Sequence, residues 1–251
     1  MALSTARRDQ LEALLRARKL DVTLTSARPL ARDAESRVST GWADLDRVAG
    51  GGAPRGELSE IVGPLSSGAT TVMQAMVGGV TQRGEIAALV DAFDRFDPVS
   101  AGTFGVDGSR LLWVRGTALD APVVRTRVVR SRASPDLLGR ILQRALKAFG
   151  VILQAGGFSL VVLDVSDVPM PALRRLPFTT WLRVERLLEH SETAGVIVAR
   201  EPVARSARGL TLRLAAQGRV EQRWSGRSDR ARRFGGFAWT PQIVSARRPG
   251  T

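Results

Sequence analysis

The chain of 251 residues contains no cysteine, no tyrosine and a single histidine, His190. The absence of cysteine excludes disulfide bonds and thiolate metal sites, and one histidine cannot build a multi-histidine site. No apolar run approaches the roughly 18 residues that a membrane-spanning helix needs. The N-terminus also lacks the apolar segment of a signal peptide. We therefore expect a soluble, cytoplasmic protein with no metal site and no membrane partner.

Acidic residues are scarce, since 24 Asp and Glu stand against 37 Lys and Arg and give a formal net charge of +13. All but two of these basic residues are arginine, the exceptions being Lys19 and Lys147. A GC-rich genome explains a preference for arginine over lysine. It does not explain the excess of bases over acids, which favours polyanionic partners and nucleic acid above all.

Apolar runs of strand length alternate with helical patterns through the middle of the chain. The expected strands are 58–62, 86–92, 111–115, 159–165 and 195–200. The expected helices run from Gly68 or Ala69 to about 84, from Ser134-Pro135-Asp136 to about 149, and over 178–190. Strands that alternate with helices predict an α/β fold with a mainly parallel sheet.

The C-terminal part has a different pattern. Residues 210–216 and 219–224 alternate between apolar and polar side chains on either side of Gln217-Gly218, which predicts an antiparallel hairpin at the sheet edge. Residues 237–244 are a further candidate edge strand, because Pro241 lacks the N–H that an inner strand must donate.

Near the N-terminus, residues 5–19 place Leu11, Leu14 and Leu15 on one face of a predicted helix. Residues 20–38 show little periodicity and are interpreted as a linker, and the glycines of 49–57 predict a loop. The leucine face has three possible uses. It can pack on the chain's own core, on a neighbouring copy, or on a different partner.

Residues 63–71, Gly-Pro-Leu-Ser-Ser-Gly-Ala-Thr-Thr, have the spacing of a phosphate-binding loop. Gly63 and Gly68 flank four residues, and Thr70, followed by Thr71, occupies the position of a magnesium ligand. The loop also follows a predicted strand and precedes a predicted helix. Such loops carry a lysine that reaches the phosphates, and here Ala69 stands in its place.

Three segments, 39–71, 88–114 and 160–164, closely resemble the RecA recombinase core in order and spacing. The resemblance extends over about residues 39–245, with a separate N-terminal helix and linker (1–38) and a C-terminal tail (246–251). It implies a RecA-like P-loop core: a mainly parallel central sheet flanked by helices, with antiparallel edge strands at the C-terminal end. It also implies that Asp164, which ends a buried strand, corresponds to the aspartate that supports magnesium.

The chain departs from RecA at two catalytic positions. The lysine is Ala69, and the glutamate that orients the attacking water is replaced by Phe93 after Asp91-Ala92. Losing a charge-assisted contact removes roughly 1.5–3 kcal/mol of binding, and losing a general base lowers the rate by about 10²–10⁴. We therefore expect no useful ATP hydrolysis, no catalytic residue and no required cofactor.

Two neighbours of Phe93 are candidate replacements. Asp94 is a poor substitute base, since one step along a strand end reverses the side chain's direction, and nothing places Arg95 near phosphate. The retained Gly63, Gly68, Thr70 and Asp164 then either preserve a turn and a strand end, which we prefer, or keep weak nucleotide or anion binding at the helix N-terminus.

Three arginine clusters are candidate sites for polyanions or partners. The first is 125–132, with Arg125, Arg127 and Arg130; the second is 200–209, with Arg200, Arg205 and Arg208; the third is 223–233. The resemblance implies that 200–209 holds a DNA-contacting loop, and a solvated loop is an equal alternative there. For the other two clusters a solvated loop is the preferred interpretation.

RecA-like chains of about this length without the catalytic lysine and glutamate resemble the ImuA family. This resemblance implies a non-catalytic adaptor in DNA-damage-induced mutagenesis. Its expected partners are an ImuB-like protein, an error-prone DnaE-type polymerase, RecA and DNA, with self-association through the N-terminal helix as a further option. Two alternatives remain open: a divergent recombinase-like ATPase, and a SulA-like inhibitor of cell division.

Overall fold

The structure is a computed structural model that describes residues 36–116, 135–204, 208–214, 221–225, 228, 233–238 and 242–245. These residues lie in one compact unit, Asp33–Arg248. Among the helices that the structure describes, none is both long enough and apolar enough to cross a membrane. The predicted helix with Leu11, Leu14 and Leu15 lies outside the described residues, as do Arg125, Arg127, Arg130 and Arg205.

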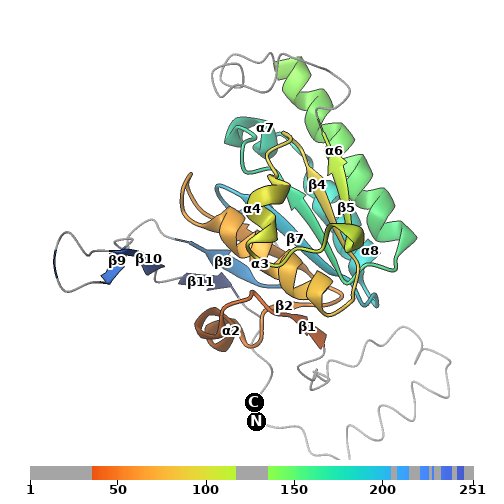
Figure 1. Cartoon of the computed structure of the whole chain (residues 1–251). Coiled ribbons are helices and arrows are strands. Elements are labelled where there is room, and N and C mark those ends of the chain that lie inside the picture. Colours follow the sequence, from red (N-terminus) through yellow and green to blue (C-terminus); the bar gives the residue numbers. More distant parts are fainter. Residues whose placement is uncertain are drawn as a thin grey trace, which may run out of the picture. The chain divides into compact units, whose positions relative to one another are not determined.

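A seven-stranded sheet in the order β11-β8-β3-β7-β6-β4-β5 forms the centre of this unit (Figure 1). Its strands are β3 (Leu58–Val62), β4 (Ala87–Asp91), β5 (Leu111–Arg115), β6 (Leu160–Asp164), β7 (Ala194–Ala199), β8 (Thr211–Arg213) and β11 (Gln242–Ser245). Six strands are parallel, and only β11 pairs antiparallel, at the edge beside β8. This arrangement confirms the predicted fold class, because parallel neighbours require the helical crossovers that the sequence pattern indicated.

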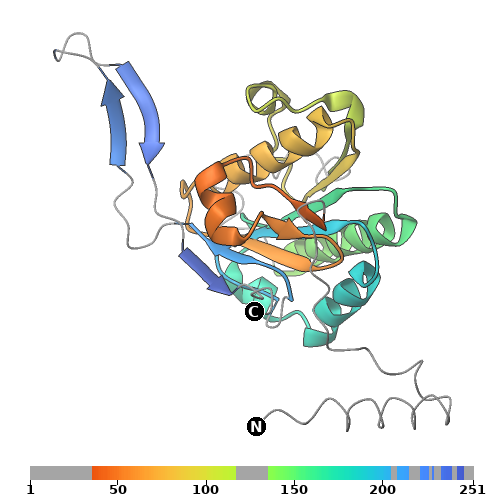
Figure 2. The ribbon, with the colours of Figure 1, turned by 90° about the horizontal axis from the view of Figure 1, so that it is seen from below.

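Helices cover both faces of the sheet, as the views in Figures 1 and 2 show. One face packs against α3 (Ala69–Gln82) and α4 (Pro98–Gly102). The other packs against α6 (Pro135–Ala155), α7 (Met170–Arg174) and α8 (Phe178–Leu188). The starts of α3 at Ala69 and of α6 at Pro135 confirm the helix starts predicted from the glycine loop and from the Ser-Pro-Asp signal.

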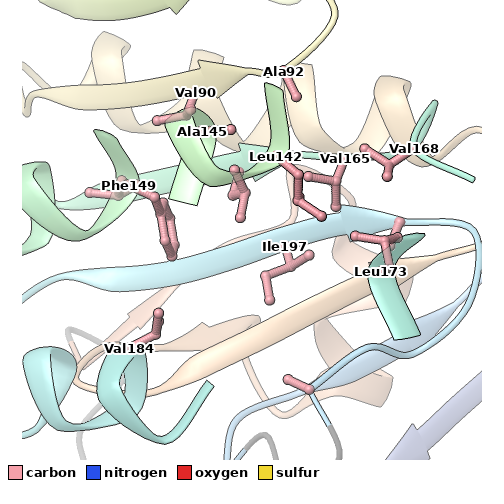
Figure 3. Packing of buried hydrophobic residues seen from close by; sticks show 14 of the residues in the cluster. Val90, Ala92, Leu142, Ala145, Phe149, Val165, Val168, Leu173, Val184 and Ile197 are labelled. Carbon is pink, nitrogen blue, oxygen red and sulfur yellow. The ribbon is translucent and has the colours of Figure 1, made fainter. Parts of the chain in front are cut away.

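Alternation along the strands divides the core into two clusters. In β6, Val161 and Leu163 belong to the cluster under α6 and α8, whereas Leu160 and Val162 belong to the cluster under α3. Figure 3 shows the first of these clusters, with Phe149 of α6 packed near β7. Because successive side chains point to opposite faces, each strand contributes to both cores and is buried on both sides.

Smaller elements complete the described part. Strands β1 (Arg37–Val38) and β2 (Ala53–Pro54) pair antiparallel, and α2 (Ala43–Ala49) connects them. The two strands lie in segments that the sequence predicted to be a linker and a loop. The sequence did not indicate them, because a strand of two residues has no detectable periodicity. A 3₁₀ turn, η3 (Gly108–Arg110), precedes β5.

The predicted hairpin of 210–216 with 219–224 is wrong. Strand β8 lies inside the sheet, parallel to β3, and its other neighbour is β11. The second segment forms β9 (Glu221–Ser225), which pairs with β10 (Arg233–Ala238) in a separate sheet. The physical reason is burial: Leu210, Leu212 and Leu214 are all buried, which an inner strand provides and an edge hairpin does not. The predicted edge strand 237–244 is divided, since β10 ends at Ala238 and β11 begins at Gln242.

Candidate functional site

The phosphate-loop sequence forms a tight connection between β3 and α3. Gly68 is the N-cap of α3 and has a left-handed backbone (φ 90°), which favours glycine. Gly63 is needed for space, because a Cβ there would lie 2.5 Å from Ser67 Oγ and 2.6 Å from the Leu214 carbonyl oxygen. The two glycines therefore have local structural reasons, and the loop has the strand–turn–helix setting that the sequence predicted.

No charged side chain belongs to α3, whose sequence is ATTVMQAMVGGVTQ. Ala69 is only 8% exposed and packs in the cluster under this helix. The polar groups that remain are the helix N-terminus and four hydroxyls: Ser66 and Thr70 are exposed, Thr71 is half-buried and Ser67 is buried. The Ser67 Oγ has no hydrogen-bond partner among the described residues. A helix N-terminus attracts anions through its free N–H groups, so weak anion binding is the chemistry left here.

Two carboxylates end neighbouring strands on the same face as α3. Asp91 of β4 and Asp164 of β6 are paired in register, and both are buried. Burial is the main cause that raises the pKa of Asp164 to about 6, with smaller contributions from the charges of Asp91 and Asp167, while hydrogen bonds from Ser166 act in the opposite direction. Burial likewise raises the pKa of Asp91. A cation placed near this pair would favour the ionised carboxylates and lower both pKa values.

The turn after β4 explains what replaces the catalytic glutamate. The Asp91 carboxylate accepts hydrogen bonds from the Phe96 N–H at 2.7 Å and the Phe93 N–H at 3.3 Å. Phe93 is 4% exposed and belongs to the cluster under α6, on the face opposite to the phosphate loop. Phe96 instead packs under α3, edge-on to Trp113. The position that the sequence resemblance matched to the water-orienting glutamate is therefore part of the apolar core.

Asp94 lies in this turn, in a left-handed conformation (φ 55°). Its carboxylate accepts two hydrogen bonds of 2.6 Å from Arg115, whose guanidinium also lies 4.6 Å from the centre of the Trp113 ring. A bidentate pair of this kind fixes both side chains. This contact supports the expectation that Asp94 does not substitute for the missing base.

Arg95 and Arg200 both contact the loop after β6. Their nitrogens lie 3.1 and 3.7 Å from Asp167, and the Arg200 Nε donates to the Ser166 carbonyl at 2.9 Å. Arg200 was a predicted polyanion contact, and the structure places it in this network. The three strands β4, β6 and β7 are therefore linked at their carboxyl ends by two arginines that share one carboxylate.

The loop after β7 is held by the strand beside it. The buried Glu60 of β3 accepts hydrogen bonds from the Val203 and Ala204 N–H groups at 2.7 and 2.9 Å. Its pKa is raised by burial, while these N–H groups lower it. Further along the loop, Arg208 pairs with Glu189 at 2.5 Å. Of the predicted contacts on the 200–209 segment, both described arginines therefore have acidic partners.

Sequence reasoning missed Glu60, although one signal was present. A charged residue in the middle of the apolar run LSEIV is unusual for a strand buried on both faces. The remaining predicted site residues, Gly63, Gly68, Thr70 and Thr71, surround the start of α3, and Asp164 ends a strand on the same face. Within the described ranges, no group of three or more acidic or histidine side chains could hold a metal ion.

Comparison with known proteins identifies a RecA N-terminal domain over residues 24–133. Protein RecA from Synechococcus sp. (strain CC9605) and from Parasynechococcus marenigrum (strain WH8102) are each 48% identical to this chain over 75 residues. Protein RecA from Prochlorococcus marinus (strain MIT 9211) is 47% identical over the same length. Each similarity covers 30% of this chain and 20% of the relative, so the chain spans about a fifth of the length of the curated relatives it matches. The chain therefore contains a RecA-like domain.

Proposed function

We propose that this chain, which contains a RecA-like domain, is a non-catalytic adaptor in DNA-damage-induced mutagenesis. In this proposal it is an ImuA-type subunit. It acts with an ImuB-type partner and an error-prone DnaE-type polymerase in translesion DNA synthesis, and RecA and DNA are further partners.

One observation carries the proposal: both catalytic positions are occupied by buried apolar side chains, on opposite faces of the sheet. Ala69 packs in the cluster under α3, and Phe93 packs in the cluster under α6. The surrounding frame consists of the Gly63–Gly68 loop before α3 and the Asp91–Asp164 pair at the ends of β4 and β6. A frame without a phosphate-binding lysine or a water-orienting glutamate supports binding of partners rather than turnover.

The described contacts also leave no evident substitute for either residue. Asp94 is engaged by Arg115, and Arg95 by Asp167. A missing cation weakens phosphate binding by about tenfold to a hundredfold, and a missing base lowers the rate by a further 10²–10⁴ or so. Both losses together support a chain that does not hydrolyse ATP at a useful rate.

ATP turnover by the purified full-length chain tests the non-catalytic part of the proposal. Phosphate release is measured with magnesium, with and without single-stranded DNA, beside Asp164→Ala as a control for contaminating ATPases. We expect the same background rate from both proteins. DNA-stimulated turnover that disappears in Asp164→Ala would overturn this part.

Co-purification tests the adaptor part. The chain is used as bait for an ImuB-type protein and, separately, for RecA, and a variant with Leu11, Leu14 and Leu15 each changed to Asp serves as the comparison. We expect the ImuB-type protein to be retained by the unchanged chain. If neither partner is retained, the mutagenesis assignment loses its main support.

A divergent ATPase is the second candidate, and the retained loop favours it. Thr70 is exposed at the start of α3, and the Asp91–Asp164 pair lies on the same face of the sheet. Titration with a fluorescent ATP analogue, with and without magnesium, separates the candidates. Tight magnesium-dependent binding that Asp164→Ala abolishes supports the ATPase, whereas weak binding independent of magnesium supports the adaptor.

A further inference from the structure

The outer surface of the helical layer formed by α6, α7 and α8 carries exposed cations. Five of them, here called the helix-face cations, are Arg140, Lys147, Arg175, Arg183 and Arg186. Arg140 and Lys147 come from α6, Arg183 and Arg186 from α8, and Arg175 caps the end of α7. None of them lies in the three clusters that the sequence pointed to.

Helix α6 packs beside α8, and both face the sheet with their apolar sides. Figure 3 shows Phe149 of α6 and Val184 of α8 among the buried residues of the cluster that they share. A Cβ at Gly150 would lie 4.0 Å from Leu187, so these residues mark the seam between the helices. Both helices cross between parallel strands, so they run in the same direction.

Helical spacing then places cations on both sides of this seam. Lys147 lies three residues before Gly150, and Arg183 lies four residues before Leu187, so each shares a helix face with the seam residue that follows it. Arg140 continues the α6 row, and seven residues along a helix span about 10 Å. The result is an extended row of positive charge on rigid elements.

These cations differ from the arginines near the carboxyl ends of the strands in how they are paired. Arg95, Arg115, Arg200 and Arg208 each have a carboxylate partner. Within the part of the chain that the structure describes, the five helix-face cations have no carboxylate partner within 4.0 Å.

The scarcity of acids on these helices explains the difference. Helix α8 has a single acidic residue, Glu185, which is buried. Helix α6 also has only one, Asp136, near its first residue. Positive charges that are exposed and have no internal partner repel one another at low salt. They are therefore available to an external anion without first breaking an ion pair.

We propose that the helix-face cations bind the phosphate backbone of nucleic acid. Repeated phosphates match a row of cations on fixed helices, and arginine binds phosphate oxygens through its forked donors. Exposed aromatic side chains are few on this surface, with Phe178 at the start of α8 the main one, so base stacking contributes little. The contact is therefore electrostatic and independent of sequence.

This inference deepens the proposed function, which already names DNA as a further partner, and it rests on that function for the presence of DNA. It concerns the charge of the helical layer, whereas the adaptor role concerns retention of an ImuB-type protein. It also differs from the expectation that the 200–209 segment provides the contact, since Arg200 and Arg208 have partners within the chain. Co-purification and nucleic-acid binding are separate measurements, so either idea can fail alone.

Fluorescence anisotropy of a labelled 20-mer, as duplex and as single strand, tests the proposal with the full-length chain between 50 and 200 mM salt. The test variant carries Lys147→Gln, Arg183→Gln and Arg186→Gln. The plot of log affinity against log salt should lose about 0.9 of its slope per lost contact on duplex and about 0.7 on single strands. The slope therefore falls by about 2 to 3, and the affinity falls at every salt concentration. Dividing each fall in slope by its factor gives the number of lost contacts, and the form with more lost contacts is the one that this surface prefers.

A matched control removes three cations that are exposed but paired. Arg47, Arg83 and Arg110 pair with Asp44, Glu85 and Asp107. Changing them to Gln takes the net charge of +13 to +10, as in the test variant, because each loses three positive charges. We expect the control to keep at least two thirds of the salt slope. A third variant, Arg183→Lys with Arg186→Lys, keeps the charge and should bind nearly as well as the unchanged chain.

Three results would overturn the proposal. The first is no binding by the unchanged chain at 50 mM salt. The second is an equal loss in the test and control variants, which would mean that binding follows net charge alone. The third is an unchanged affinity in the test variant. It would mean that these cations contact an acidic protein surface or only solvent. Circular dichroism of every variant verifies that a loss of binding is not a loss of folding.

Discussion

The two faces of the central sheet differ in where their charges lie. On the α3 face, the helix itself has no charged residue, and the buried Asp91 and Asp164 lie at the strand ends. The opposite face has an apolar interior, and its outer surface carries the five helix-face cations, which have no carboxylate partner among the described residues. The loop 63–68 and α3 therefore carry no cation, whereas the outer surfaces of α6 and α8 carry several.

This difference shows that the geometry and the charge of a phosphate site are separable. The geometry depends on backbone properties, such as the left-handed Gly68 and the close approach at Gly63, and it persists without the lysine. The charge depends on single side chains that a substitution removes. A loop of the right shape is therefore weak evidence for catalysis, and strong evidence for the fold around it.

Introducing the two catalytic residue types that this chain lacks should have the largest effect, and we expect a loss of folding stability. In a double variant with Ala69→Lys and Phe93→Glu, we expect no ATP turnover and a stability lower by at least about 3 kcal/mol, because a buried phenyl ring is exchanged for a carboxylate. Urea denaturation measures this, and Phe93→Leu, which conserves volume better, should lose less than about 1.5 kcal/mol. A stable double variant that hydrolyses ATP would mean that residue 93 can turn toward the phosphate loop.

Removing the buried carboxylate of β3 should have the next largest effect. Glu60→Ala leaves the N–H groups of Val203 and Ala204 without acceptors, so we expect a loss of about 2–4 kcal/mol. Glu60→Gln keeps an acceptor oxygen and should change stability by less than about 1 kcal/mol. Hydrogen exchange at the two amides provides a local measurement. Equal protection in both variants would contradict the proposed anchoring of this loop.

Neutralising Asp164 should stabilise the protein in a pH-dependent way. Its folded pKa of about 6 lies above the ordinary value of 3.8, so the folded state holds this proton more tightly than the unfolded chain does. The associated stability is present below about pH 4 and is lost as the pH rises through 6. Asp164→Asn should therefore gain up to about 3 kcal/mol at pH 7.5 and nearly nothing at pH 4. Urea denaturation at the two pH values measures this, and a gain independent of pH would contradict the burial of the charge.

Neutralising the helix-face cations should have the smallest effect on folding. Arg183→Gln with Arg186→Gln should change stability by less than about 0.5 kcal/mol, since both side chains are exposed. Arg55 is the contrasting case: its side chain is 11% exposed, and it contacts Glu85 and the Glu192 carbonyl oxygen. Arg55→Gln should lose about 2 kcal/mol. Similar thermal melting shifts for both changes would mean that the helix-face cations are structural.

Much of the α/β part was predictable because its signals are local. Apolar runs located β3 to β7, and the glycine spacing located the start of α3. The pairing of β8 was predicted wrongly. Alternation of apolar and polar residues indicates a strand with one buried face, and it does not show which strand lies beside it. The RecA-like resemblance was confirmed at the level of the domain, and the ImuA assignment stays a proposal.

At the candidate site, the sequence predicted the retained and lost positions but not their surroundings. It identified Ala69 and Phe93, and it could not show that they pack in different clusters. It pointed to Arg200 and Arg208, and it could not show that Asp167 and Glu189 accept them. Ion pairs between residues distant in the chain have no local sequence pattern. The sequence therefore shows where charged residues are concentrated, and it does not show which of them have an ion-pair partner.

The sequence by itself determined the class of fold, the glycine frame of the phosphate loop and the loss of its cation, because these depend on residue type at fixed spacing. Only the tertiary structure decided which charges neutralise one another. The network of Arg95, Asp167 and Arg200 joins three strands, while the helix-face cations meet no acid among the residues that the structure describes. The physical reason is that charge pairing depends on distances of a few ångströms, which folding sets between residues far apart in the chain.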